Sequence, residues 1–214
     1  MRDIHAVILD MDGLMFDTEQ LSLSTLQQAG GRFGVELTDA DLLPLRGLPV
    51  PAFCAALAAL VPPEVDVQAL WSTAKKAFAD VLHRDIVAPK KPGLDLFLQR
   101  VKARNLPLAL ASSTKRATVE WMLEHAGVRD YFTALVCGDE VAHGKPAPDI
   151  FLAAARALGA DPAHCLALED APHGAAAALA AGMMTIMVPD LTQPDEALAA
   201  RLTAVCPSLL DVRF

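Results

Sequence analysis

The amino-acid sequence predicts a doubly wound α/β fold that carries an all-helical insertion. Short apolar runs, each ending in small polar or acidic residues, alternate along the chain with helical stretches rich in Ala and Leu. Runs that are apolar on both faces are typical of parallel strands covered by helices. The spacing is uneven in one place, because the first run ends near Asp10 and the second begins only at Leu106. A crossover needs one helix, so this gap indicates an inserted domain.

The expected strands are residues 6–9, 106–111, 134–137, 165–168 and 185–188. Helices are expected between the later strands, at residues 117–126, 149–158 and 174–181. Connections of the strand–helix–strand type are right-handed, and a series of them builds a doubly wound parallel sheet.

The insertion has a helical pattern throughout. Its expected helices are residues 20–29, 39–43, 50–60 and 67–82, with no strand-like alternation between them. Pro and Gly residues at positions 89–93 suit a domain boundary. We therefore expect an α/β domain made of residues 1–16 and 89–214, and a helical domain made of residues 17–88.

Composition excludes some classes of function. Hydrophobic residues make up 53% of the chain and charged residues 21%, which is enough to bury a core and argues against disorder. The net charge of -8 offers no basic face to a nucleic acid. A phosphate site in such a chain must build its positive potential locally, from a metal, a lysine or backbone N–H groups.

Location is also suggested by the sequence. No signal-peptide pattern and no uninterrupted apolar stretch of membrane-spanning length is present. The four cysteines show no metal-binding spacing, which favours small buried residues in a reducing compartment. We expect a cytoplasmic protein without membrane or nucleic-acid partners, and a monomer.

The ends of the first two expected strands carry polar side chains. Asp10 and Asp12, at i and i+2 before Gly13, can point to one side of an extended chain, so that one attacks while the other handles protons. A calcium loop or a plain turn carries the same pattern. Ser112 and Ser113, followed by a third hydroxyl, can hold an anion at a helix start, although a simple helix cap is the alternative.

The ends of the next two strands carry charged groups. Lys145, between a glycine and a proline-rich helix entrance, suits a fixed positive charge near a developing anion. A surface lysine is the alternative. Glu169 and Asp170 directly follow a buried run, where carboxylates are costly unless paired or bound to metal. An exposed turn or a helix cap is the alternative for this pair.

Ligands of parallel α/β sheets bind beyond the carboxyl ends of the strands. The successive strand ends supply an acid pair, hydroxyls, a lysine and a second acid pair, which together suit phosphoryl transfer. A carboxylate nucleophile divides one difficult displacement into two. Oxygen ligands of this kind are those that Mg²⁺ prefers, so we expect Mg²⁺ as the cofactor.

The chain resembles the haloacid dehalogenase superfamily, and within it the beta-phosphoglucomutase-like and sugar-phosphatase branch. The matching stretches are DMDGLMFDTE at residues 10–19, LASST at 110–114, GKPAPDIF at 144–151 and LED at 168–170. They stand in the family's order and cover essentially the whole chain. The resemblance implies a Rossmann-like core and a mobile helical cap that closes over the site and selects the substrate.

The resemblance also implies roles for the residues in these motifs. Asp10 would be the nucleophile and Asp12 the general acid and base. Lys145 would neutralise the nucleophile and the phosphoryl charge. The phosphate would be held by Ser112, Ser113, Lys145 and the backbone near Met11, and the magnesium by Asp10, the backbone carbonyl of Asp12, Asp170 and, in support, Glu169.

One branch of the family, the sugar-phosphate mutases, carries a histidine after the first motif and an arginine in the cap's substrate loop. The corresponding positions here are Ser22 and Val50, and neither matches. Arg46 and Gly47 are the candidate substrate-loop residues of this chain. The departure favours a phosphatase that hydrolyses small phosphate monoesters, such as sugar phosphates, through an aspartyl-phosphate. Its partner would be a small phosphorylated metabolite.

Three other interpretations remain open. A sugar phosphomutase of the beta-phosphoglucomutase type would use the same nucleophile. A signalling receiver domain also combines acids, a hydroxyl and a lysine, but its acceptor follows the third strand and it has no helical insertion. A catalytically silent protein on the same scaffold would bind a phosphorylated ligand without turning it over. The presence of every expected catalytic residue argues against this interpretation.

Overall fold

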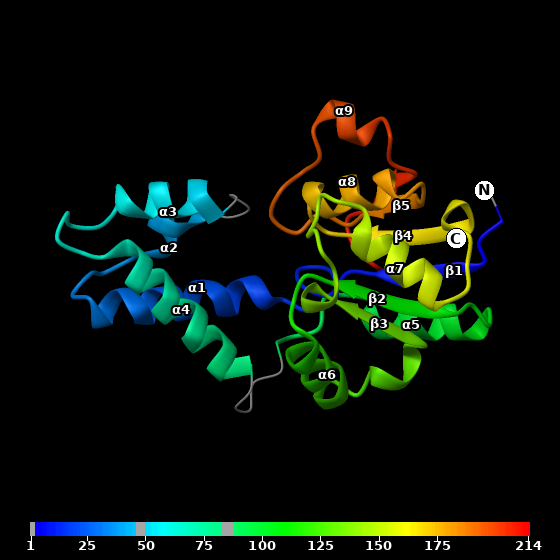
Figure 1. The fold of residues 1–214 in the computed structure, drawn as a ribbon, viewed down its shortest axis with the longest axis horizontal. Helices are drawn as coiled ribbons and strands as arrows, with labels where there is room; N and C mark the ends of the chain where they lie inside the picture. Colours follow the sequence, from blue (N-terminus) through cyan, green and yellow to red (C-terminus); the bar gives the residue numbers. More distant parts are fainter. Residues whose placement is uncertain (1–2, 46–49, 83–87) are drawn as a thin grey trace. The chain divides into compact units, whose positions relative to one another are not determined.

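A computed structural model describes residues 3–45, 50–82 and 88–214 (Figure 1). The chain forms two compact units. One consists of Met1–Asp17 and Pro89–Phe214, and the other of Thr18–Ala88. None of the helices in the described ranges combines the length and the apolar character that a membrane crossing needs.

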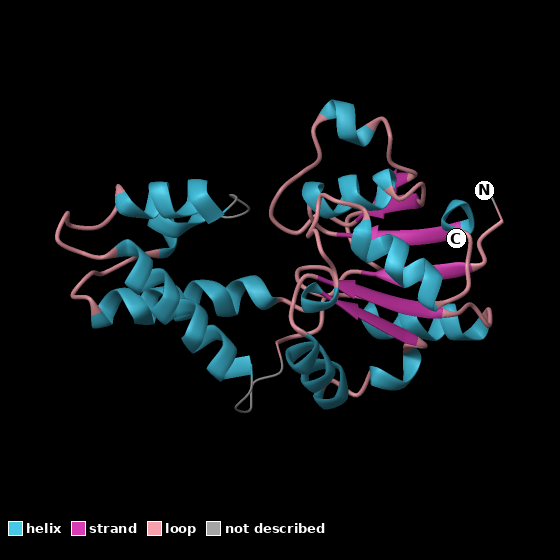
Figure 2. Cartoon of the chain, viewed as in Figure 1, coloured by secondary structure: helices cyan, strands magenta, loops and turns pink. Residues whose placement is uncertain are grey.

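The first unit is built on a six-stranded sheet, drawn as magenta arrows in Figure 2. All neighbouring strands are parallel, in the order β3-β2-β1-β4-β5-β6. The strands are β1 (Ala6–Leu9), β2 (Leu108–Ser112), β3 (Ala134–Cys137), β4 (Cys165–Glu169), β5 (Met184–Met187) and β6 (Ala204–Val205). The predicted doubly wound parallel sheet is confirmed, and β6 is a short strand that was not expected from the sequence.

Helices connect these strands. They are α5 (Leu94–Ala103), α6 (Arg116–His125), α7 (Asp149–Ala157), α8 (Pro172–Ala180) and α9 (Glu196–Ala199), with short 3₁₀ helices at Arg129–Tyr131, Gly138–Glu140 and Pro162–His164. The chain reverses direction across the sheet between β3 and β4. Right-handed crossovers therefore place α5 and α6 on one face and α7 and α8 on the other.

The core beneath α7 and α8 shows this arrangement. Phe151 of α7 and Ala177 of α8 are buried in one apolar cluster with Ile8, Ala109 and Ala167 of the three central strands. Small alanines on the helices and strands allow close approach between the layers. Because β1 is flanked by β2 and β4, its carboxyl end lies at the centre of the sheet edge, where the chain direction reverses.

The second unit is all-helical in its described residues. It contains α1 (Thr18–Arg32), α2 (Asp39–Leu42), α3 (Val50–Ala58) and α4 (Val67–Leu82), with a 3₁₀ helix at Leu43–Leu45. Leucines from these helices form its core, with Leu57 and Leu70 fully buried. The capping box of α2 pairs the Thr38 side chain with the backbone of Asp41 and the Asp41 side chain with the backbone of Thr38.

Most expected elements are present, with shifted ends. α1 runs three residues beyond the expected end at Ala29, through two glycines. β2 begins at Leu108 rather than Leu106. The helix α5 was not expected, although Leu94, Phe97 and Val101 have helical spacing and are buried. The four cysteines are free and buried, which agrees with their interpretation as small packed residues.

Candidate active site

The carboxylate of Asp10 stands at the end of the central strand β1. Its backbone N–H donates to the carbonyl of Leu168 at 3.1 Å, which continues the pairing between β1 and β4. The residue is only 5% exposed. A carboxylate buried at this depth needs a partner, because desolvation of an ionised group is costly. That partner is Lys145.

Lys145 lies in the segment between β3 and α7. Its Nζ donates to Asp10 Oδ1 at 2.5 Å, to Glu169 Oε1 at 2.6 Å and to the carbonyl of Ala111 at 3.0 Å. An ammonium group has three protons, so these contacts use all of them. Burial alone would lower the pKa of Lys145, but the charges of Asp10 and Glu169 raise it above its ordinary value. Lys145 is therefore a fixed positive charge that joins the ends of three strands.

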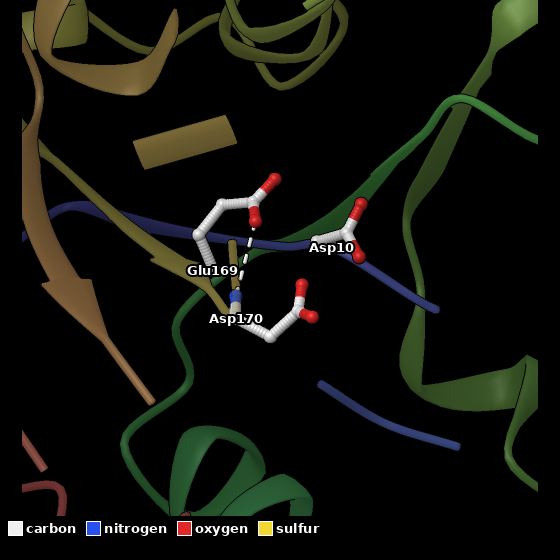
Figure 3. A group of neighbouring side chains, drawn as sticks. All are labelled: Asp10, Glu169 and Asp170. Atoms are coloured by element: carbon white, nitrogen blue, oxygen red, sulfur yellow. Dashed lines mark hydrogen bonds between the residues drawn. The ribbon is translucent and has the colours of Figure 1, made fainter. Parts of the chain in front are cut away.

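The acidic pair follows β4. Glu169 is buried, and its Oε2 accepts hydrogen bonds from the backbone N–H groups of Asp170 at 3.0 Å and Ala171 at 3.1 Å. Figure 3 shows Glu169 and Asp170 beside Asp10. Each of the three residues offers a carboxylate oxygen, and these atoms lie within 4.8 Å of one another. Both oxygens of Glu169 already accept protein hydrogen bonds, so Asp10 and Asp170 are the better-placed ligands.

Three carboxylates and one ammonium group leave an excess of negative charge. Burial, opposed by the charge of Lys145 and aided by the charges of Glu169 and Asp12, raises the pKa of Asp10 to about 8. Burial also raises the pKa of Asp170 to about 10, together with the charges of Glu169 and Asp10. A divalent cation would offset this excess, and hard carboxylate oxygens are suitable ligands for it. The donor set therefore fits Mg²⁺.

Asp12 lies two residues beyond Asp10 and faces the end of β2. Its Oδ2 accepts hydrogen bonds from Ser112 Oγ at 3.2 Å and from Thr114 Oγ1 at 2.8 Å. The Ser112 hydroxyl oxygen also accepts from the backbone N–H of Thr114 at 3.0 Å, which closes a tight turn at the start of α6. The first and third hydroxyls of the Ser-Ser-Thr run therefore hold the carboxylate of Asp12 in this structure.

Two glycines make room for the carboxylates. Gly13 has a φ of +82°, and a Cβ at this position would collide with the carboxylate of Asp170. Gly174 lies in the first turn of α8, and a Cβ there would collide with the carboxylate of Glu169. Any larger residue at either position would displace one of the two acids.

The residues expected at the site fall into two groups that share the edge of the sheet. Asp10, Lys145, Glu169 and Asp170 form one contact network, and Asp12 and Ser112 form another. Ser113 is exposed, whereas the side chain of Met11 is buried and apolar, so Met11 is a candidate for phosphate binding only through its backbone. Arg46 and Gly47 lie outside the described residues.

Thr114 was expected only as the third hydroxyl of the cluster after β2, without a site role of its own. It makes the shorter of the two hydroxyl contacts to Asp12. The third hydroxyl of the Ser-Ser-Thr run was the signal that pointed to it.

A family model described as haloacid dehalogenase-like hydrolase matches residues 7–188. The chain belongs to this family. The match spans every strand that carries a site residue, from β1 to β5, so the resemblance inferred from the motifs is confirmed. The residues of the network around Asp10 all lie within the matched region.

Named relatives of this hydrolase include phosphatases. The chain is 35% identical over 182 residues to fructose-1-phosphate phosphatase YqaB of Escherichia coli. The alignment covers 85% of this chain and 95% of that protein. It is 30% identical over 187 residues to the phosphorylated carbohydrates phosphatase of Thermotoga maritima, in an alignment that covers 86% of this chain and 84% of that protein.

A solved structure has the same fold. The HAD family hydrolase from Deinococcus radiodurans R1 superposes with a TM-score of 0.79 at 25% identity and covers 100% of this chain and 95% of that chain. Its crystals hold bound phosphate and sodium. The similarity extends over both compact units of the chain, the helical one included.

Proposed function

We propose that this protein is a Mg²⁺-dependent phosphatase that hydrolyses small phosphate monoesters through an aspartyl-phosphate on Asp10. The observation that carries the proposal is the Asp10 carboxylate, which is buried at the central strand end and bonded to Lys145 beside Asp170. The phosphatases named among the relatives support this choice of reaction and point to phosphorylated sugars or similar metabolites as substrates.

The proposed first step is displacement at phosphorus. A carboxylate oxygen of Asp10 attacks, the new O–P bond forms, and the bond from phosphorus to the leaving oxygen breaks. Lys145 holds one Asp10 oxygen through its 2.5 Å contact and so leaves the other to attack. Asp12, held by the Ser112 and Thr114 hydroxyls, donates a proton to the leaving oxygen.

The proposed second step returns the enzyme to its starting state. Asp12, now ionised, accepts a proton from a water molecule that attacks phosphorus, and the bond to Asp10 breaks to release inorganic phosphate. Asp10 and Asp170 would hold the cation, with Glu169 in support. When bound, Mg²⁺ would screen the negative charges of the nucleophile and the phosphoryl group from each other.

The proposal also assigns a task to the helical unit Thr18–Ala88, namely selection of the substrate as a cap. The resemblance to the family supports this assignment. We further propose a cytoplasmic, monomeric enzyme, for which the free and buried cysteines suit a reducing compartment. Light scattering of the purified protein tests the monomer, and a dimer mass would contradict it.

The function is tested by phosphate release from sugar phosphates, nucleotides and p-nitrophenyl phosphate, with Mg²⁺ or with EDTA. Wild type should release phosphate only with the metal, and Asp10→Asn should lower kcat by at least about 10⁴-fold. The matched control is Asp95→Asn, which makes the same change at an exposed carboxylate paired with Lys90 and should behave as wild type.

A second measurement examines the intermediate. With p-nitrophenyl phosphate, whose leaving group departs without a proton, Asp12→Asn should slow hydrolysis of the acyl phosphate more than its formation, so acid-quenched protein should carry a phosphate adduct on the peptide that contains Asp10. Phosphate release by Asp10→Asn at the wild-type rate would remove Asp10 as the nucleophile. Conversion of a sugar phosphate to its isomer without release would favour the phosphomutase, and no turnover of any ester would favour the silent binding protein.

A further inference from the structure

Asp190 carries a buried carboxylate oxygen that the proposed reaction does not use. The residue lies in the loop that follows β5, and its Oδ1 accepts from Lys91 Nζ at 2.6 Å. Its Oδ2 is buried and accepts no hydrogen bond from any group in the part of the chain that the structure describes. Such an oxygen is costly to bury, so its retention calls for a donor.

The sheet places this loop beside the metal ligands. β5 is the neighbour of β4, with Met187 in register with Glu169, and the N–H of Val188 donates to the carbonyl of Glu169 at 2.7 Å. Asp190 and Asp170 therefore leave the same sheet edge from adjacent parallel strands. Their closeness is also visible in the electrostatics, because Asp190 adds to the effects of burial, Glu169 and Asp10 that raise the pKa of Asp170.

Lys91 fixes the orientation of Asp190. Its side chain is 23% exposed, and its backbone N–H donates to the carbonyl of Met15 at 2.8 Å, which ties it to the loop after β1. The ion pair with Lys91 offsets part of the charge of Asp190, and the remaining charge still acts on Asp170, whose pKa it helps to raise.

Mg²⁺ in proteins usually keeps several of its water molecules, and carboxylates around them orient the coordination shell. We propose that Asp190 is a positioning residue that accepts, through Oδ2, a hydrogen bond from a water molecule bound to the cation held by Asp10 and Asp170. Lys91 holds the other carboxylate oxygen, Oδ1, and so leaves Oδ2 as the acceptor. This inference rests on the metal site of the proposed function and deepens it.

The alternative is a purely structural tie, in which the ion pair only anchors the segment after residue 88 to the loop after β5. A structural tie would change the stability of the metal-free protein and leave its affinity for the cation unchanged. An outer-shell carboxylate would change the affinity itself, by about 10-fold or more. The two roles are therefore separated by a binding measurement that involves no substrate.

The experiment titrates Mg²⁺ alone into the full chain by isothermal calorimetry, after confirming by circular dichroism that each variant is folded. Asp190→Asn keeps the shape of the side chain and removes its charge, and Asp190→Ser also shortens it. Both should bind Mg²⁺ about 10-fold more weakly than wild type. Asp95→Asn, at the exposed pair with Lys90, is the matched control and should bind as wild type does.

Affinities of both Asp190 variants within about twofold of wild type would overturn the inference, since outer-shell residues cost more than that. An equal loss in Asp95→Asn would also overturn it, because the effect would then be one of net charge alone. Phosphate release on the same preparations separates this inference from the proposed function. If Asp10→Asn abolishes release while the Asp190 variants bind Mg²⁺ normally, the function stands and only the role of Asp190 fails.

Discussion

The two units of the chain differ in what they bury. Among the described residues, the buried carboxylates are Asp10 and Glu169, and both belong to the α/β unit. The buried polar residues described in the helical unit are Thr18 and Thr25, whereas its core consists of leucines and other apolar side chains. One unit therefore contains buried charges at a cost to its stability, and the core of the other is stabilised by apolar burial and helix packing.

This difference indicates where function limits stability. Charges at the sheet edge repel one another until a cation or a proton offsets them, so the α/β unit should respond to metal and to charge changes. The helical unit should respond to packing changes. The chain offers a reporter for each, because Trp71 lies in α4 and Trp121 in α6. Single-tryptophan versions, made by Trp121→Phe or Trp71→Phe, allow the unfolding of each unit to be followed separately.

The largest effect is expected from Lys145→Met. The change leaves Asp10 and Glu169 buried without their cation and should lower the unfolding free energy of the metal-free α/β unit by about 3 kcal/mol. Phosphate release should fall by about 100-fold or more, since the fixed charge at the nucleophile is lost. Urea unfolding followed at Trp121 in EDTA measures the first quantity.

The control for this prediction is Lys76→Met, which removes an exposed lysine of α4. It should change the stability of either unit by less than about 0.5 kcal/mol. A loss at Lys145→Met that appears equally at Trp71 would contradict the comparison, because the helical unit would then depend on the charges of the sheet edge.

The next effect belongs to the helical unit. Leu57 is fully buried in its core, whereas Leu60, one turn further along the chain, is 39% exposed. Leu57→Ala should lower the unfolding free energy at Trp71 by about 2–4 kcal/mol, and Leu60→Ala by much less. Mg²⁺ should not restore the loss, which distinguishes it from the loss at Lys145. A metal-dependent recovery of Leu57→Ala would show that the two units share one cooperative transition.

Much of the α/β unit could be predicted from the sequence for one physical reason. Strands buried on both faces are uniformly apolar, so they stand out, and parallel topology gathers their carboxyl ends at one edge. Asp10, Lys145 and Glu169 were therefore placed together although they are far apart in the chain. The pairing of β6 was not predicted, because a two-residue strand has no pattern of its own.

Contacts that depend on side-chain direction could not be predicted in the same way. The Thr114 hydroxyl reaches Asp12 only because the chain turns sharply after β2, and Lys91 meets Asp190 across 99 positions of the sequence. In the helical unit the error concerned helix length. The first helix was expected to end at Ala29, but α1 continues through Gly30 and Gly31 to Arg32 because tertiary packing outweighs the low helix propensity of glycine.

The smallest expected effect compares a glycine in each unit. Gly31 of α1 faces open space, so Gly31→Ala should raise the unfolding free energy at Trp71 by about 0.5–1 kcal/mol through helix propensity. Gly174 of α8 lies against the Glu169 carboxylate, so Gly174→Ala should instead destabilise the α/β unit by about 1–3 kcal/mol and weaken Mg²⁺ binding. The same substitution is thus expected to change the unfolding free energy in opposite directions. At Gly31 only the helix propensity of the backbone matters, whereas at Gly174 the added methyl group would collide with the neighbouring carboxylate. A gain in stability at both positions would show that Glu169 yields easily, and the site would then be less rigid than its hydrogen bonds indicate.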